Sequence, residues 1–163
     1  MIVIGLDPSL TATGWGVIHA EGSRLRHIAS GTIKPGASLP MPARLAMLFS
    51  EVRAVLTEHR PDTAGMEEVF ANRNPQSTLK LGQARGAVMA ALGDSGIPCA
   101  EYAARSIKKG LTGTGSADKT QVRAMVERLL PGAKPDSLDA SDALAVAITR
   151  ATMLGREKLV MQA

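Results

Sequence analysis

The sequence predicts an α/β fold in which a mixed five-stranded sheet has helices on both faces. Two observations lead to this prediction. Segments of extended character crowd the first 34 residues, and helical and extended segments alternate from residue 40 onward. The chain has 163 residues and a hydrophobic content of 45%, which suits one domain with a full core.

The first third of the chain is predicted to form three successive antiparallel strands. Residues 2–6 are apolar and end at Asp7, as is typical of a central strand buried on both faces. Residues 8–14 contain Pro, Ser, Thr and Gly and should end that strand. Strands over residues 15–20 and 25–34 follow, joined by a turn at Glu21-Gly22-Ser23.

Residues 40–60 have the clearest helical pattern of the chain. Six apolar side chains share one face at helical spacing: Leu45, Leu48, Phe49, Val52, Val55 and Leu56. Pro61 ends this helix, because the residue before a proline disfavours helical backbone. A short strand over residues 63–69 and a polar loop over residues 71–77 come next.

The remaining elements are mainly helical. We expect a helix over residues 77–93, a strand over 98–102, and helices over 104–109, 118–130 and from 139 onward. Three antiparallel strands followed by alternating helices and strands resemble the order of the ribonuclease H-like fold. We expect one domain over residues 1–155 and a C-terminal tail over residues 156–163.

Composition favours a cytoplasmic protein with a polyanionic partner. The formal net charge is +4, and a basic surface attracts nucleic acid. No charged leader precedes the first strand and no apolar run approaches the length of a membrane span, so we expect no membrane association. The single cysteine, Cys99, lies in an apolar stretch, where we expect a buried, reduced thiol.

Acidic residues in three separated segments are candidates for one metal site. Asp7 ends the first strand, Glu67 and Glu68 lie on a later strand, and Asp139 and Asp142 open the last helix. Acids gathered by buried elements repel one another unless a cation neutralises them. Mg²⁺ or Mn²⁺ would neutralise them and would also promote chemistry on a phosphodiester. The pattern therefore predicts metal-dependent phosphoryl transfer.

Each acid also has an ordinary structural explanation. Asp7 precedes a proline, and Asp-Pro commonly starts a turn. Adjacent strand residues point to opposite faces, so only one of Glu67 and Glu68 can join Asp7, and alternation alone leaves the choice open. Asp139 and Asp142 share one face of a helix start, where the helix dipole favours negative charge.

Longer motifs carry a more specific resemblance than the acids alone. The motifs are Gly5-Leu6-Asp7-Pro8, Thr13-Gly14-Trp15-Gly16-Val17-Ile18, Met66-Glu67-Glu68-Val69-Phe70, Leu79-Lys80-Leu81-Gly82-Gln83-Ala84-Arg85-Gly86, Glu101-Tyr102-Ala103-Ala104-Arg105, Gly113-Thr114-Gly115-Ser116-Ala117 and Asp139-Ala140-Ser141-Asp142-Ala143-Leu144-Ala145. In this order they closely resemble the RuvC family of Holliday junction resolvases, which has the ribonuclease H-like fold. The resemblance runs from Ile4 to about Thr149.

The resemblance implies a set of metal ligands. They are Asp7, Glu67, Asp139 and Asp142, which selects Glu67 over Glu68 and leaves Glu68 expected to face away from the site. Two Mg²⁺ ions per subunit, for which Mn²⁺ would substitute, would share these carboxylates. Hydrolysis of the phosphodiester would then leave a 5′-phosphate and a 3′-hydroxyl.

The resemblance also implies residues that act on or bind DNA. Lys108 and Lys119 match basic family positions near the scissile phosphate and are expected to stabilise developing charge, with solvated lysines as the alternative. Phe70 matches a family aromatic that contacts bases, with core packing as the alternative. The other expected DNA contacts, each with a solvated charge as its alternative, are Arg73, Lys80, Arg85, Arg105 and Lys109.

Small residues on the helix over residues 77–93 raise the question of a dimer. Gly82, Gly86 and Ala90 lie four apart on one face, which allows close packing either on the protein's own sheet or against a second copy. A four-way junction is two-fold symmetric and suits a homodimer with two active sites. The resemblance further implies a branch-migration helicase as a partner.

The leading functional hypothesis is a cytoplasmic, nucleoid-associated endonuclease. It would resolve four-way DNA junctions by paired symmetric nicks in recombination and repair. One alternative is a non-catalytic junction-binding protein whose acids form structural salt bridges. Another is an actin-like or sugar-kinase-type ATPase, because Asp7-Pro8-Ser9 with Thr11 and Thr13 loosely matches a phosphate loop, although such proteins need two domains of this kind.

Overall fold

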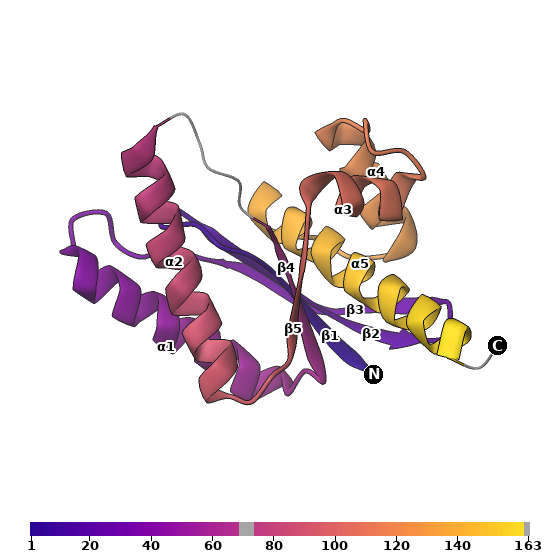
Figure 1. Cartoon of the computed structure of the whole chain (residues 1–163), viewed down its shortest axis with the longest axis horizontal. Coiled ribbons are helices and arrows are strands. Elements are labelled where there is room, and N and C mark those ends of the chain that lie inside the picture. The colour runs from indigo at the N-terminus through magenta and orange to yellow at the C-terminus, as the bar shows by residue number, and fades with distance from the viewer. Residues whose placement is uncertain (69–73, 162–163) are drawn as a thin grey trace.

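A five-stranded sheet forms the middle layer of the molecule in the computed structural model, which describes residues 1–68 and 74–161 (Figure 1). The strands are β1 (Ile2–Asp7), β2 (Thr13–Glu21), β3 (Arg24–Ile33), β4 (Thr63–Glu67) and β5 (Cys99–Tyr102). Their order in the sheet is β3-β2-β1-β4-β5. The first three strands pair antiparallel, and β4 pairs parallel with both β1 and β5. The predicted mixed sheet is confirmed.

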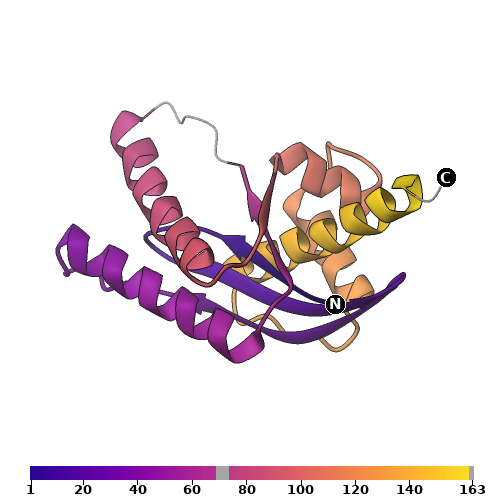
Figure 2. The same ribbon diagram turned by 60° about the horizontal axis from the view of Figure 1, so that its bottom comes forward.

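Helices cover both faces of this sheet, as predicted. They are α1 (Met41–His59), α2 (Pro75–Asp94), α3 (Ala104–Thr112), α4 (Lys119–Leu129) and α5 (Leu138–Met161). Figures 1 and 2 show α1 and α2 on one face and α3, α4 and α5 on the other. None of these described helices is both long and apolar enough to cross a membrane.

The side chains of β1 divide between two hydrophobic clusters. Val3 packs with residues of α3, α4 and α5, whereas Ile4 and Leu6 pack with residues of α1 and α2. All three side chains are fully buried. The continuous apolar run therefore reflects a central strand covered on both faces, because alternate side chains enter different clusters.

Several element boundaries differ from the predicted ones. β2 begins two residues early at Thr13, whose hydroxyl donates to the Ser9 carbonyl and accepts from the Ser9 amide. α2 begins at Pro75 because Asn74 caps it, accepting from the amides of Gln76 and Ser77. α5 continues without a break to Met161, so the expected boundary between domain and tail at residue 155 falls inside a helix.

The prediction that Cys99 is a buried core thiol is wrong. Cys99 is exposed, because β5 is an edge strand that pairs with β4 alone. Its residues alternate between exposed and half-buried positions. Apolar sequence neighbours indicated burial, but burial depends on the position of the strand in the sheet.

Candidate active site

Two of the predicted ligands lie side by side at the ends of the central parallel strands. Leu6 of β1 pairs with Met66 of β4, so the next residues, Asp7 and Glu67, end neighbouring strands. Parallel strands place their carboxyl ends at one edge, where open α/β sheets bind ligands.

The structure also distinguishes Glu67 from Glu68. A Cβ added at Gly65 would touch the side chains of Val146 and Arg150 on α5, so position 65 faces that helix. Two residues further on, Glu67 points to the same face. Alternation within the folded sheet thus selects the glutamate that the resemblance selected.

Close packing of α5 on the sheet brings the third and fourth predicted ligands to this edge. Gly14 pairs with Asp7 in the sheet, and a Cβ added at Gly14 would collide with the backbone carbonyl of Asp139. The first turn of α5 therefore rests directly on β2 beside Asp7. Asp139 and Asp142 are three residues apart on that helix, hence on one side of it.

The hydroxyl of Ser137 fixes the start of α5. It accepts a hydrogen bond from the Ala140 amide at 3.0 Å, as an N-capping side chain does. It also hydrogen-bonds the hydroxyl of Thr32 on β3. The turn that carries Asp139 and Asp142 is in this way tied to the sheet.

Electrostatics shows that these acids form one cluster. Burial, followed by the negative charges of Glu67, Asp142 and Asp139, raises the pKa of Asp7 to about 7, while Lys119 opposes this rise. Burial followed by the charge of Asp142 also raises the pKa of Glu67. Burial is the largest cause of the raised pKa of Asp142. Such shifts at an edge of the sheet are typical of a functional site.

A cleft of about 490 Å³ opens over the cluster. Its lining includes Asp7, Glu67, Asp142, Lys108 and Lys119. The two lysines, from α3 and α4, therefore share the cleft with three of the four predicted ligands. Both lower the pKa of Glu67, so their charges reach the site.

Among the described residues, Lys119 forms an ion pair with the cluster. Its Nζ lies 3.7 Å from Oδ2 of Asp142, and 82% of its side chain is exposed. An ion pair so open to water contributes little to stability. The lysine is therefore available for a phosphate that enters the cleft.

Glu68 lines the cleft as well, so the expectation that it faces away from the site is wrong. β4 ends at Glu67, and beyond the strand end the alternation of faces no longer determines direction. Leu81 of α2 lines the same cleft. Glu68 adds a further acidic group to it.

The donor set suits a hard divalent cation. All four predicted ligands are carboxylates, and Mg²⁺ binds oxygen ligands, usually one or two carboxylates while it keeps several waters. Within residues 1–68 and 74–161, no three acidic, His or Cys side chains are close enough to hold an ion as they stand.

The residues predicted to contact DNA fall into three groups. Lys80 on α2 and Arg105 and Lys109 on α3 are exposed, as a phosphate contact requires. Arg85 instead has a side chain only 14% exposed and an ion pair with Glu101. The remaining two predicted contacts, Phe70 and Arg73, lie outside the described residues.

The interaction between Arg85 and Glu101 is the main feature of this region that sequence reasoning missed. The two residues come from α2 and β5, and nothing in their spacing indicates contact. The only available signal is that both lie in motifs that carry the family resemblance.

Fold and site together define a class of protein: a ribonuclease H-like α/β protein with an acidic cleft at the ends of its central parallel strands. The model of one family, crossover junction endodeoxyribonuclease RuvC, matches residues 3–150. The chain therefore belongs to the RuvC family of crossover junction endodeoxyribonucleases, and the resemblance inferred from the motifs is confirmed.

Individual relatives agree with this assignment. The RuvC of Erythrobacter litoralis is 55% identical and that of Zymomonas mobilis 54%, each over 93% of this chain and at least 90% of the relative. Thermus thermophilus RuvC, solved in complex with a Holliday junction substrate, has a TM-score of 0.91 at 32% identity over 96% of each chain. A yeast mitochondrial Holliday junction resolvase, 11% identical over 95% of this chain and 82% of the other, shares the fold with a TM-score of 0.65.

Proposed function

We propose that this chain resolves four-way DNA junctions by metal-dependent hydrolysis of phosphodiester bonds. The observation that carries the proposal is the carboxylate cluster on β1, β4 and α5, where burial and mutual repulsion raise the pKa of Asp7 to about 7. Membership of an endodeoxyribonuclease family supports DNA cleavage as the function of this cluster and argues against the ATPase hypothesis. Recombination and repair are the processes that generate such junctions.

The four carboxylates of Asp7, Glu67, Asp139 and Asp142 would hold two Mg²⁺ ions per subunit, with Mn²⁺ as a substitute. When bound, such ions would lower the pKa of a water molecule, so that it loses a proton and attacks the phosphate as hydroxide. The ions would also stabilise the negative charge on the leaving oxygen. Cleavage of the bond to the 3′-oxygen leaves a 5′-phosphate and a 3′-hydroxyl, ends that a ligase can join.

The lysines supply positive charge within the cleft. Lys108 of α3 and Lys119 of α4 line it together with the acids. We assign both to the scissile phosphate, where a fixed cation stabilises charge that develops during displacement. The exposed Lys80, Arg105 and Lys109 would hold the DNA backbone further out.

We also propose a homodimer whose seam is one face of α2. Gly82, Gly86, Met89 and Ala90 are exposed on this helix, as is Leu79, which is 64% exposed. A Cβ added at Gly82 or Gly86 would meet nothing within 4 Å, so these glycines do not pack on the protein's own sheet. Small residues that flank exposed apolar ones suit a second copy of the helix, and two-fold symmetry matches the junction.

A cytoplasmic location and a branch-migration helicase partner complete the proposal. Both follow from action on chromosomal junctions, since a junction must be moved to a cleavable position before it is cut. Co-purification of a helicase with the tagged chain from cells that contain four-way junctions would support the second point.

The deciding experiment compares a synthetic four-way junction with a linear duplex of the same sequence. With Mg²⁺, the chain should make paired symmetric nicks in the junction alone, and EDTA or Asp7→Asn should abolish them. Equal cutting of the duplex would refute junction specificity. Binding without cleavage in Mg²⁺ or Mn²⁺ would favour the non-catalytic hypothesis.

A further inference from the structure

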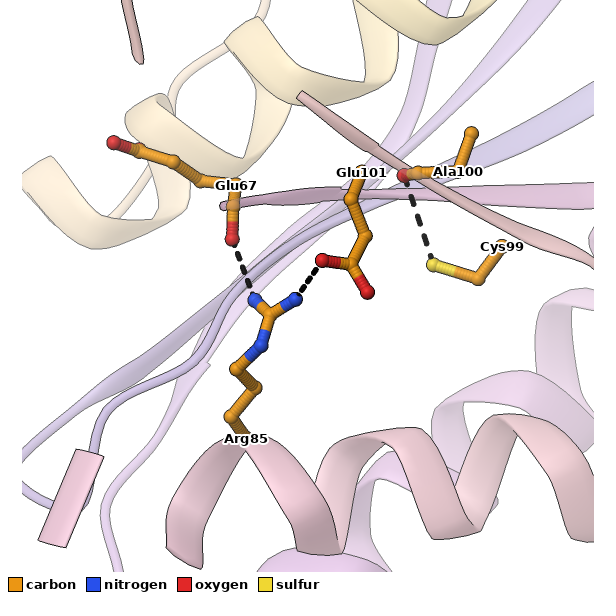
Figure 3. A network of polar contacts seen from close by, with 5 residues as sticks. All are labelled: Glu67, Arg85, Cys99, Ala100 and Glu101. Atoms are coloured by element: carbon orange, nitrogen blue, oxygen red, sulfur yellow. Dashed lines mark hydrogen bonds and ion pairs between the residues drawn. The ribbon is translucent and has the colours of Figure 1, made fainter. Parts of the chain in front are cut away.

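Arg85 lies behind the candidate active site, on the face of the sheet opposite to α5. Figure 3 shows its guanidinium between Glu67 and Glu101, with the Glu67 carbonyl directed toward it and the Glu67 carboxylate directed away. One nitrogen, Nη1, donates to the Glu67 backbone oxygen at 2.6 Å. The other, Nη2, donates to Oε2 of Glu101.

Hydrogen bonds hold both polar groups of the peptide unit between Glu67 and Glu68. The carbonyl of Glu67 accepts from Arg85, and the amide of Glu68 donates to the Tyr102 carbonyl at 2.9 Å. These are the two polar groups of the peptide that follows the last residue of β4. Tyr102 of the neighbouring strand holds the amide of this peptide, and Arg85 holds its carbonyl through a charge-assisted hydrogen bond, which is among the stronger kinds available.

Glu101 makes the arrangement specific for arginine. It lies on β5 opposite Met66 of β4, so it holds the guanidinium at the strand that carries Glu67. The planar guanidinium presents donors on two separate nitrogens in fixed directions, one to the carbonyl and one to the carboxylate, whereas the donors of a lysine all lie on one nitrogen.

We propose that Arg85 is a positioning residue for Glu67, held in place by Glu101, and not a contact to DNA phosphate. The inference rests on the proposed function, in which Glu67 is a metal ligand. By fixing the peptide after β4, Arg85 sets the direction from which the Glu67 carboxylate enters the cleft. Groups that orient a metal ligand typically change metal affinity or activity about 10- to 100-fold when they are removed.

The test uses Arg85→Lys and Glu101→Gln. Arg85→Lys keeps a charge that can bind phosphate but loses the fork. We expect junction cleavage to fall about 10- to 100-fold, the Mg²⁺ concentration for half-maximal cleavage to rise, and junction affinity in EDTA to stay unchanged. Glu101→Gln should change cleavage and Mg²⁺ dependence in the same direction, because the guanidinium is then held less firmly.

A DNA-contact role for Arg85 gives the opposite pattern. Junction affinity in EDTA would drop, its dependence on salt would weaken, and the Mg²⁺ requirement would not change. Glu101→Gln would then tighten junction binding by freeing a cation. Either of these results, or Arg85→Lys behaving as the parent chain in every assay, overturns the proposal.

A matched control separates positioning from general loss of stability. Arg53 of α1 also forms an ion pair with a carboxylate, its Nε lying 3.0 Å from Oδ2 of Asp94 on α2. Neither of these two residues lines the cleft that contains the predicted metal ligands. Arg53→Lys should leave cleavage and Mg²⁺ dependence unchanged. If Arg85→Lys does not fold, as thermal melting would show, Glu101→Gln decides the question.

Two readouts do not need cleavage and so remain informative if the proposed function fails. The first is Mn²⁺ affinity by electron paramagnetic resonance, which Arg85→Lys should weaken. The second is alkylation of Cys99, the only cysteine of the chain. Although the residue is exposed, partial desolvation of the thiol and then the charge of Glu101 raise its pKa to about 11, while Arg85 lowers it. Arg85→Gln should therefore slow alkylation and Glu101→Gln should speed it. Unchanged alkylation in both variants would show that the guanidinium does not lie at β5.

Discussion

Gly14→Ala should separate the two halves of the carboxylate cluster. Asp7 pairs with Gly14 in the sheet, and an added Cβ there would collide with the carbonyl carbon and oxygen of Asp139. Both groups are backbone, so no side-chain rotation relieves the contact. Restoring ordinary contact at 3.4–4 Å requires the first turn of α5 to move by on the order of 1 Å, because closely packed interiors have no free space.

Two magnitudes follow from this displacement. Overpacking costs about 1–3 kcal/mol, which corresponds to a fall in Tm of about 2–12 °C for a chain of this size. A misplacement of about 1 Å in a catalytic group reduces activity about 100-fold. We therefore expect Gly14→Ala to fold, to melt earlier, and to cleave a four-way junction about 100-fold more slowly.

The matched control for this experiment is Gly155→Ala on the same helix. A Cβ at Gly155 meets nothing within 4 Å, so alanine should be neutral or stabilise the helix by up to about 1 kcal/mol. Thermal melting and junction cleavage are measured for both variants. If Gly14→Ala retains the melting temperature and the cleavage rate of the parent chain, the contact between α5 and β2 does not position Asp139.

Three further predictions concern charge, assembly and capping. Because the pKa of Asp7 is raised from 3.8 to about 7, the folded chain binds a proton that the unfolded chain releases in this range, so metal-free stability should fall as pH rises from about 4 to 7. Mg²⁺ should accordingly raise Tm more at pH 8 than at pH 5, and a difference that persists in Asp7→Asn would exclude Asp7 as its source. Gly86→Glu should convert a dimer into monomers, as measured by sedimentation velocity, without lowering Tm, because a side chain at position 86 meets no other atoms of the chain. A dimer that persists in this variant would place the seam elsewhere. Ser137→Ala removes the acceptor for the Ala140 amide and should cost about 1 kcal/mol in chemical denaturation, whereas an unchanged midpoint would show that water replaces the cap.

The sequence alone was sufficient to predict the sheet, its helical layers and the acids that gather at one edge of the sheet. The apolar run before Asp7 carries information about burial on both faces, and motif order selects Glu67. Other features depend on which strands are neighbours, which local patterns do not encode. Cys99 is exposed because β5 is at the sheet edge. Arg85 contacts Glu101 because the fold places α2 and β5 beside the end of β4.

The contact between α5 and the sheet restricts where this protein can change over evolution. The inward face of the helix includes three alanines, Ala140, Ala143 and Ala147, all fully buried, and a Cβ on Gly5 below them would strike the Ala143 carbonyl. Neither side can accept a larger residue. We therefore expect variation in DNA preference at exposed positions of α2 and α3, such as Lys80 and Arg105, where substitutions leave the packing of α5 on the sheet unchanged.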